Sequence, residues 1–155
     1  WGDYPYVTSS HCTTGGVLLN GVPRTAIRHV YGVAKMYDTY VGKKEFELKD
    51  SPFKEIFTKL REVGEEYGAT TGRPRQINFL NLEHLEKAIR INDITHLVVN
   101  KTDVLEIVKC FYLYDRYGFG AKFNSLSEMT KYIIKEVHSI NPNIQITFSG
   151  TKESI

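Results

Sequence analysis

The segment from Gly68 to Arg75 combines the residue types that bind small anions. It reads Gly68-Ala69-Thr70-Thr71-Gly72-Arg73-Pro74-Arg75 and follows a predicted helix. Glycines let backbone N–H groups approach a ligand, threonine hydroxyls add donors, and each arginine can hold a carboxylate or phosphate through two parallel bonds. Composition alone fits a solvated turn with exposed arginines about equally well.

A second polar group, Asn100-Lys101-Thr102-Asp103, follows a short apolar run. An aspartate at this place can accept hydrogen bonds from N1 and N2 of guanine while the lysine stem covers the ring, and adenine offers no matching pair of donors. The same residues also fit a polar turn that caps the next element. Ser149 and Gly150 follow a later predicted strand, where a backbone donor could reach a purine carbonyl group.

A third candidate is the hydroxyl-rich stretch from Tyr6 to Gly16, in which serine and threonine side chains precede paired glycines. Such a stretch could surround phosphate oxygens. It also fits a surface loop rich in serine and threonine, with His11 as a structural hydrogen-bond donor.

The elements that position these segments alternate between helix and strand. Apolar residues at helical spacing predict helices over 24–38, where Pro23 precedes the first turn, and over 52–66. Asn81 can cap a third helix that ends near residue 92, and the capping box of Ser125 and Glu128 predicts another after residue 125. Apolar or alternating runs predict strands over 95–99, 107–114 and 144–148. This alternation indicates an α/β fold with a mainly parallel sheet, whose functional loops gather at the carboxyl ends of the strands.

The composition indicates a soluble globular protein of one domain or part of one, with 155 residues, 41% hydrophobic and 25% charged. A net charge of +2 provides no field that favours nucleic acid or an anionic membrane. Cys12 and Cys110 follow no metal or redox spacing, so we expect reduced core residues in a cytoplasmic protein. No apolar run of about 18 residues is present. Because the sequence starts at Trp1, we expect an upstream portion.

The motifs together resemble the adenylosuccinate synthetase family. That family carries Tyr/Phe-Val-Thr-Ser-Ser-Asn-Thr-Thr, Gly-Ala-Thr-Thr-Gly-Arg-x-Arg, Thr-Lys-Leu-Asp and Ser-Thr-Gly-Pro in this order. The matching stretches here are Tyr6–Thr14, Gly68–Arg75, Asn100–Asp103 and Phe148–Thr151, and the loop motif is the most specific of them. The resemblance implies a P-loop-NTPase-like synthetase architecture, with 1–155 as the carboxy-terminal part of a single domain.

The resemblance also implies a reaction and its binding residues. The family phosphorylates the purine 6-oxygen of IMP with GTP and displaces that phosphate with the aspartate amine, a reaction of purine nucleotide biosynthesis that cationic donors favour. The implied aspartate-binding residues are Ala69, Thr70, Thr71, Gly72, Arg73 and Arg75. Those for the purine monophosphate are Thr8, Val41 and Arg73. Those for GTP are Arg75, Lys101, Thr102, Asp103, Phe148, Ser149 and Gly150.

The family's general base, general acid, phosphate loop and Mg²⁺ ligands belong to its amino-terminal half. The resemblance therefore implies no catalytic or metal-binding residue within 1–155, and we expect no ligase turnover from this chain alone. It further implies a homodimer, with Mg²⁺ bound by the amino-terminal part.

Departures from the family pattern keep other interpretations open. His11 replaces an asparagine, Lys43-Lys44-Glu45-Phe46 replaces a Gly-Pro-Phe-Pro stretch, Asn100 replaces a threonine and Thr151 replaces a proline. One alternative is a phage-type relative that acts on dGMP to form a diaminopurine precursor. Another is a guanine-nucleotide-binding module without ligase activity, and a third is an inactive homologue that serves as a scaffold.

Overall fold

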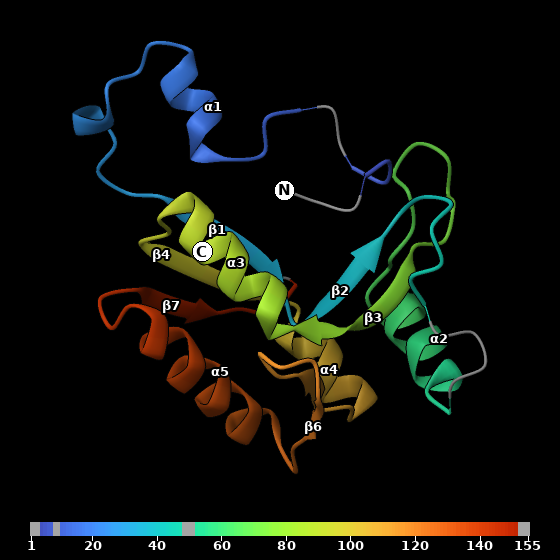
Figure 1. Cartoon of the computed structure of the whole chain (residues 1–155). Coiled ribbons are helices and arrows are strands. Elements are labelled where there is room, and N and C mark those ends of the chain that lie inside the picture. Colours follow the sequence, from blue (N-terminus) through green and yellow to red (C-terminus); the bar gives the residue numbers. More distant parts are fainter. Residues whose placement is uncertain (1–3, 8–9, 48–51, 152–155) are drawn as a thin grey trace.

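The computed structural model describes residues 4–7, 10–47 and 52–151, in which helices pack around two small sheets (Figure 1). The helices are α1 (Thr14–Leu19), α2 (Lys54–Val63), α3 (Leu82–Asn92), α4 (Thr102–Val108) and α5 (Leu126–Ile140), with a 3₁₀ turn η1 at Arg24–Ala26. The strands are β1 (Tyr31–Lys35), β2 (Tyr37–Tyr40), β3 (Gln76–Asn81), β4 (His96–Asn100), β5 (Tyr112–Tyr114), β6 (Gly120–Lys122) and β7 (Gln145–Phe148). No helix in the described ranges is long and apolar enough to cross a membrane.

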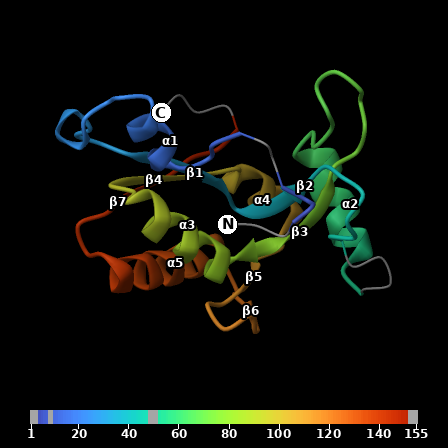
Figure 2. The ribbon, with the colours of Figure 1, turned by 45° about the horizontal axis from the view of Figure 1, so that its top comes forward.

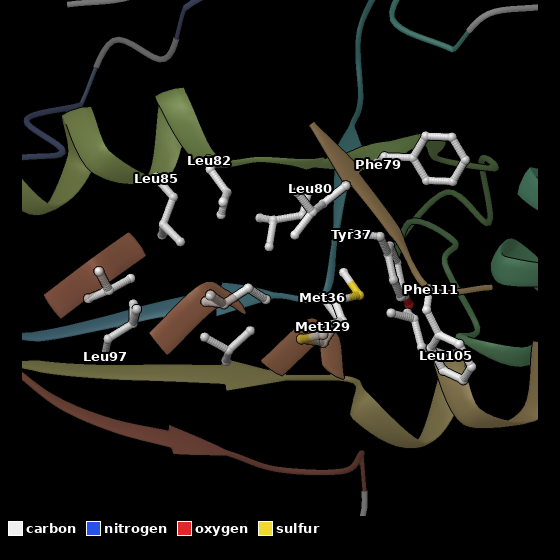
Figure 3. Packing of buried hydrophobic residues seen from close by; sticks show 14 of the residues in the cluster. Met36, Tyr37, Phe79, Leu80, Leu82, Leu85, Leu97, Leu105, Phe111 and Met129 are labelled. Carbon is white, nitrogen blue, oxygen red and sulfur yellow. The ribbon is translucent and has the colours of Figure 1, made fainter. Parts of the chain in front are cut away.

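A three-stranded parallel sheet in the order β1-β4-β7 forms the centre of the fold. Leu97 and Val99 of β4 belong to the same buried cluster as apolar residues of α3 and α5 (Figure 3). Burial of such side chains is the main favourable contribution to folding. Because β4 and β7 are parallel neighbours, the loops that follow them leave the sheet at the same edge (Figure 2). The predicted α/β fold, with a parallel sheet flanked by helices, is thereby confirmed.

A second, mixed sheet has the order β2-β3-β5-β6, with β3 and β5 parallel and the outer pairs antiparallel. The chain passes from the first sheet to the second at Met36, whose backbone N–H donates to the carbonyl of Asn100 at 3.0 Å. Met36 and Tyr37 are almost fully buried, and they connect the cores under the two sheets (Figure 3). β1 and β2 are therefore two halves of one bent segment.

The prediction of a helix over residues 24–38 was wrong, because this stretch forms η1, β1 and β2. Its apolar residues fit helical spacing, but Tyr31 and Val33 point outward, 63% and 65% exposed. Gly32 packs inward so tightly that a Cβ atom there would lie 2.4 Å from Cδ1 of Ile94. The alternation of inward and outward residues belongs to a strand that pairs with β4, which the local spacing does not reveal.

The strand predicted over 107–114 was wrong in its first half, where α4 continues to Val108 and only Tyr112–Tyr114 is strand. Lys109, in the left-handed region at φ 56°, ends the helix. Asn81 and Ser125 cap α3 and α5 as predicted, each accepting a hydrogen bond from a backbone N–H three residues later. β3 and β6 were not predicted.

Both cysteines are free, but only Cys110 is partly buried. Cys12 is exposed, so the prediction that it is a core residue was wrong. Cys12 lies just before the short helix α1, in which only Gly16 is buried.

Asp38 lies in a cavity of about 320 Å³ between β2 and the start of α3, which Asn81 and His84 also line. Burial raises its pKa to about 6, and a hydrogen bond from the Asn81 backbone N–H lowers it only in part. The pKa of Asp38 in the folded chain is above the ordinary 3.8, so its neutral form favours folding. This contribution to the free energy of unfolding is present at low pH and is lost as the pH rises through 6.

Replacing Asp38 by asparagine should therefore stabilise the chain increasingly with pH. Relative to the wild type, we expect Asp38→Asn to gain about 2 kcal/mol in unfolding free energy between about pH 4 and about pH 7.5, measured by urea unfolding. Glu83→Gln, at an exposed site on α3, is the control and should show no such gain. A difference for Asp38→Asn that does not change with pH would contradict the buried titration.

Candidate functional site

The loop after α2 is a short turn held by its own backbone. Gly68 N donates to Arg73 O and Gly72 N donates to Gly68 O, both at 2.8 Å. Gly72 has φ +63°, which favours glycine, and the hydroxyl of Thr71 accepts from Arg73 N at 3.3 Å. Thr70, Thr71 and Arg73 are exposed. The structure thus places the predicted aspartate-binding residues Ala69–Arg73 on one exposed tip, whereas Arg75 lies apart from the tip.

Arg75, at the end of this loop, points inward to a buried carboxylate. Its Nη1 donates to Oε2 of Glu66 at 2.8 Å. Lys35 Nζ donates to both oxygens of Glu66, at 2.7 and 2.8 Å, and Tyr37 Oη donates to Oε1 at 2.9 Å. Glu66 is 1% exposed. We call Lys35, Tyr37, Glu66 and Arg75 the Glu66 cluster.

The electrostatics of the Glu66 cluster keep its carboxylate ionised and its phenol neutral. Burial would raise the pKa of Glu66, but hydrogen bonds from Lys35 and Tyr37 and the positive charge of Lys35 outweigh it and lower the pKa. Burial and the neighbouring charge of Glu66 raise the pKa of Tyr37 far above its ordinary value. Tyr37 is therefore a stable donor and Glu66 a stable acceptor.

The second predicted element, after β4, meets the loop after β7. Oδ1 of Asp103 accepts from the Thr151 hydroxyl at 3.0 Å, and Oδ2 accepts from Thr151 N at 2.9 Å. Thr102 N donates to Ser149 O at 3.2 Å. Gly150 lies so close that a Cβ atom there would be 3.3 Å from Cγ of Asp103. The structure therefore places the predicted guanine-binding residues of both loops together.

Asp103 is ionised and has some acceptor capacity left. Burial would raise its pKa, but hydrogen bonds from Thr151 and Val104 outweigh burial and lower the pKa. Val104 N donates to Oδ1 at 3.0 Å, which makes three bonds to the carboxylate with those from Thr151. A carboxylate offers roughly four acceptor directions, so a two-bond contact with guanine requires Thr151 to release one of them.

Lys101 joins the two predicted segments. It adopts the left-handed conformation, φ 68°, and its Nζ donates to the carbonyl of Gly64 at 2.9 Å, just before the arginine loop. Gly64 sits against the ring of Tyr37, since a Cβ atom there would lie 2.2 Å from Tyr37 Oη. Asn100 Oδ1, at the end of β4, is buried and has no hydrogen-bond partner among the described residues.

The predicted purine monophosphate site is only partly visible, because Thr8 lies outside the described residues. A cavity of about 570 Å³ is lined by Tyr6 and Val7 from the amino-terminal segment and by Tyr40, Val41 and Lys43 from the end of β2 and the residues after it. Val41 thus lies across a cavity from the residues that precede Thr8. The predicted GTP-site residue Phe148 ends β7 and packs against the core.

Sequence reasoning missed three members of the Glu66 cluster and the role of Gln76. The Gln76 amide group donates to the carbonyls of Gly42 and Lys44 and accepts from Phe46 N at 2.8 Å. It thereby fixes the segment in which this chain departs from the family pattern. The only local signal for Glu66 was an acidic residue directly before the loop, which its exposed neighbour Glu65 shares.

Comparison with known proteins gives a consistent result along the chain. The family model described as adenylosuccinate synthetase matches residues 1–155. The adenylosuccinate synthetase of Thermus thermophilus is 44% identical over 137 residues, which cover 86% of this chain and 33% of the relative. That of Geobacillus kaustophilus is 49% identical over 107 residues, covering 67% of this chain and 24% of the relative.

A solved structure of fully ligated adenylosuccinate synthetase from Plasmodium falciparum superposes with a TM-score of 0.67 at 28% identity, covering 93% of this chain and 42% of that one. The chain spans about a third of the length of the curated relatives it matches. The agreement of motifs, fold and relatives shows that the chain belongs to the adenylosuccinate synthetase family.

Proposed function

We propose that this chain is the carboxy-terminal part of a ligase that joins aspartate to IMP with GTP and forms adenylosuccinate. The observation that carries the proposal is the junction of Asp103 with Ser149–Thr151, which Lys101 ties to the arginine loop through Gly64. In this proposal Asp103 selects guanine and the arginine loop binds an anion, and hydrogen bonds connect the two segments.

Asp103 is the residue that distinguishes guanine from adenine in this proposal. Its ionised carboxylate accepts from N1 and N2 of guanine, and the stem of Lys101 covers the ring. Adenine has no donor at its N1 position, so it would leave a charged acceptor unpaired, which is costly in a partly buried site. Ser149 and Gly150, in the loop after β7, line the other side of the guanine site. Thr102 and Phe148 position the two loops.

The loop tip holds the aspartate substrate. The guanidinium of Arg73 has no hydrogen-bond or ion-pair partner in the described part of the chain, so it is available for a two-bond contact with a carboxylate. Ala69, Thr70, Thr71 and Gly72 add hydroxyl and backbone donors beside it. The exposed position suits a substrate that is enclosed only when another part of the protein covers the tip.

The purine monophosphate occupies the cavity between Tyr6 and Val41, with Thr8 at its phosphate. Within the described residues, no group of three or more His, Cys, Asp or Glu side chains gathers to bind a metal ion. We propose that Mg²⁺ is held by the amino-terminal part, which also supplies the general base and acid. The homodimer and the cytoplasmic location stay predictions.

The complete protein should convert IMP, aspartate and GTP to adenylosuccinate, identified by product mass, and the isolated chain should form none. Offering dGMP in place of IMP separates the phage-type alternative, because that enzyme would add aspartate to dGMP instead. Calorimetry with aspartate plus a purine monophosphate separates a simple guanine-nucleotide-binding module, which would bind neither. GTP hydrolysis by the complete protein without any aspartate adduct would contradict the proposal.

A further inference from the structure

The Glu66 cluster contains one more positive charge than negative charge. Glu66 carries one negative charge and is bonded to two cations, Lys35 and Arg75, while the Tyr37 phenol stays neutral. The Glu66 side chain is 2% exposed, whereas those of Lys35 and Arg75 are 24% and 32% exposed. The excess positive charge is therefore carried by the two more accessible side chains of the cluster, which an anionic group can approach.

Arg75 retains donors for such a group. A guanidinium has about five N–H donors, and only Nη1 of Arg75 has a partner among the described residues. The carboxylate of Glu66 accepts from this one nitrogen and accepts from Lys35 with both oxygens. The third donor of Lys35 goes to the Thr39 hydroxyl at 3.3 Å, so Lys35 contributes positive charge and Arg75 contributes free donors. A buried acceptor that holds a cation by one edge orients the remaining donors, as in other preorganised anion sites.

The cluster is also linked to the guanine-binding loop. Glu66 lies two residues after Gly64, whose carbonyl accepts from Lys101 and whose backbone packs against Tyr37. The backbone of Glu66 bonds to the loop end as well, since Arg75 N donates to Glu66 O at 3.0 Å. Lys101, two residues before Asp103, is thus hydrogen-bonded to the stretch of chain that carries Glu66.

We propose that Glu66 is a positioning residue that presets Arg75, beside the positive charge of Lys35, for the phosphate groups of the guanine nucleotide whose base Asp103 binds. This inference rests on the proposed function. Removing the charge of Glu66 would raise the net positive charge, which by itself favours anions. It would also leave the two cations without the acceptor that orients them. We expect this loss of orientation to lower the affinity for phosphate more than the added charge raises it, since exposed charges are screened.

The test compares GDP with guanosine in calorimetric titrations of the complete protein. For Glu66→Gln, we expect guanosine affinity to stay within about twofold of the wild type, while the additional affinity that the phosphates of GDP provide falls by about tenfold or more. Steady-state kinetics should show the same split, with a raised KM for GTP and a smaller change in kcat. Glu65→Gln, the adjacent exposed carboxylate, is the matched control and should leave both affinities unchanged.

Three results would overturn the role of Glu66. In the first, the additional affinity that the phosphates of GDP provide is unchanged in Glu66→Gln. In the second, this additional affinity is larger in the variant and disappears with added salt. In the third, the variant loses guanosine binding together with GDP binding, which would mean that Glu66 only maintains the fold. A wild-type protein that binds adenosine as tightly as guanosine would instead contradict the proposed function, so the two failures are distinguishable.

Discussion

Replacing Asp103 by asparagine in the complete protein should move nucleotide preference from GTP to XTP. Asparagine presents one amide donor where the carboxylate had an acceptor, so it faces the N2 amino group of guanine donor to donor. Xanthine has a carbonyl oxygen at that position and restores the pair. A site built around hydrogen bonds rejects a mismatched analogue strongly, so we expect kcat/KM for GTP to fall at least about 100-fold while that for XTP rises.

The readout is kcat/KM for GTP and XTP with IMP and aspartate saturating. Glu106→Gln, on the same helix α4, is the control, since Glu106 pairs with the exposed Lys109 and its removal should change neither value. Unchanged GTP dependence in Asp103→Asn would remove Asp103 from the site. An equal loss for both nucleotides would indicate a disturbed loop, because Asp103 also accepts from Thr151.

Replacing Arg73 by leucine should impair the use of aspartate far more than the use of GTP. The guanidinium is the strongest donor on the loop tip, and losing a two-bond contact with a carboxylate costs a few kcal/mol. We expect KM for aspartate to rise about 100-fold, and KM for GTP to change by no more than about threefold. Steady-state titration of each substrate at saturating levels of the others measures both.

Arg90→Leu provides the matched control for charge, because Arg90 is exposed on α3 and pairs with Glu86 on the same helix. It should leave both KM values unchanged. Equal losses for aspartate and GTP in Arg73→Leu would argue for general unfolding and against a role in binding aspartate.

The elements with local signals were predicted well. The caps at Asn81 and Ser125 determine where α3 and α5 begin through contacts with residues only three positions later. The apolar run of β4 can likewise be recognised from the residues of the strand alone. β1 was mistaken for helix because its identity depends on pairing with β4, whose partner residues lie 65 positions away in the chain. Local spacing carries no information about such a distant partner.

The candidate site was predictable in its residue types but not in its supporting contacts. The arginine loop and Asp103 have recognisable spacing, and the parallel sheet explains why Ser149 lies beside Thr102. Glu65 and Glu66 are indistinguishable in the sequence, and only the fold buries one of them against Lys35, 31 residues earlier. Which carboxylate becomes part of the site is decided by packing.

The central claim is that the connected loops bind guanine through Asp103 and aspartate through Arg73 on the loop tip. A crystal structure of the complete protein with GDP, IMP and aspartate tests it most directly. We predict guanine N1 and N2 within hydrogen-bonding distance of Asp103, with one bond from Thr151 released, and a carboxylate of the aspartate on Arg73. A nucleotide bound elsewhere, with Asp103 still bonded only to Thr151 and Val104, would contradict the claim.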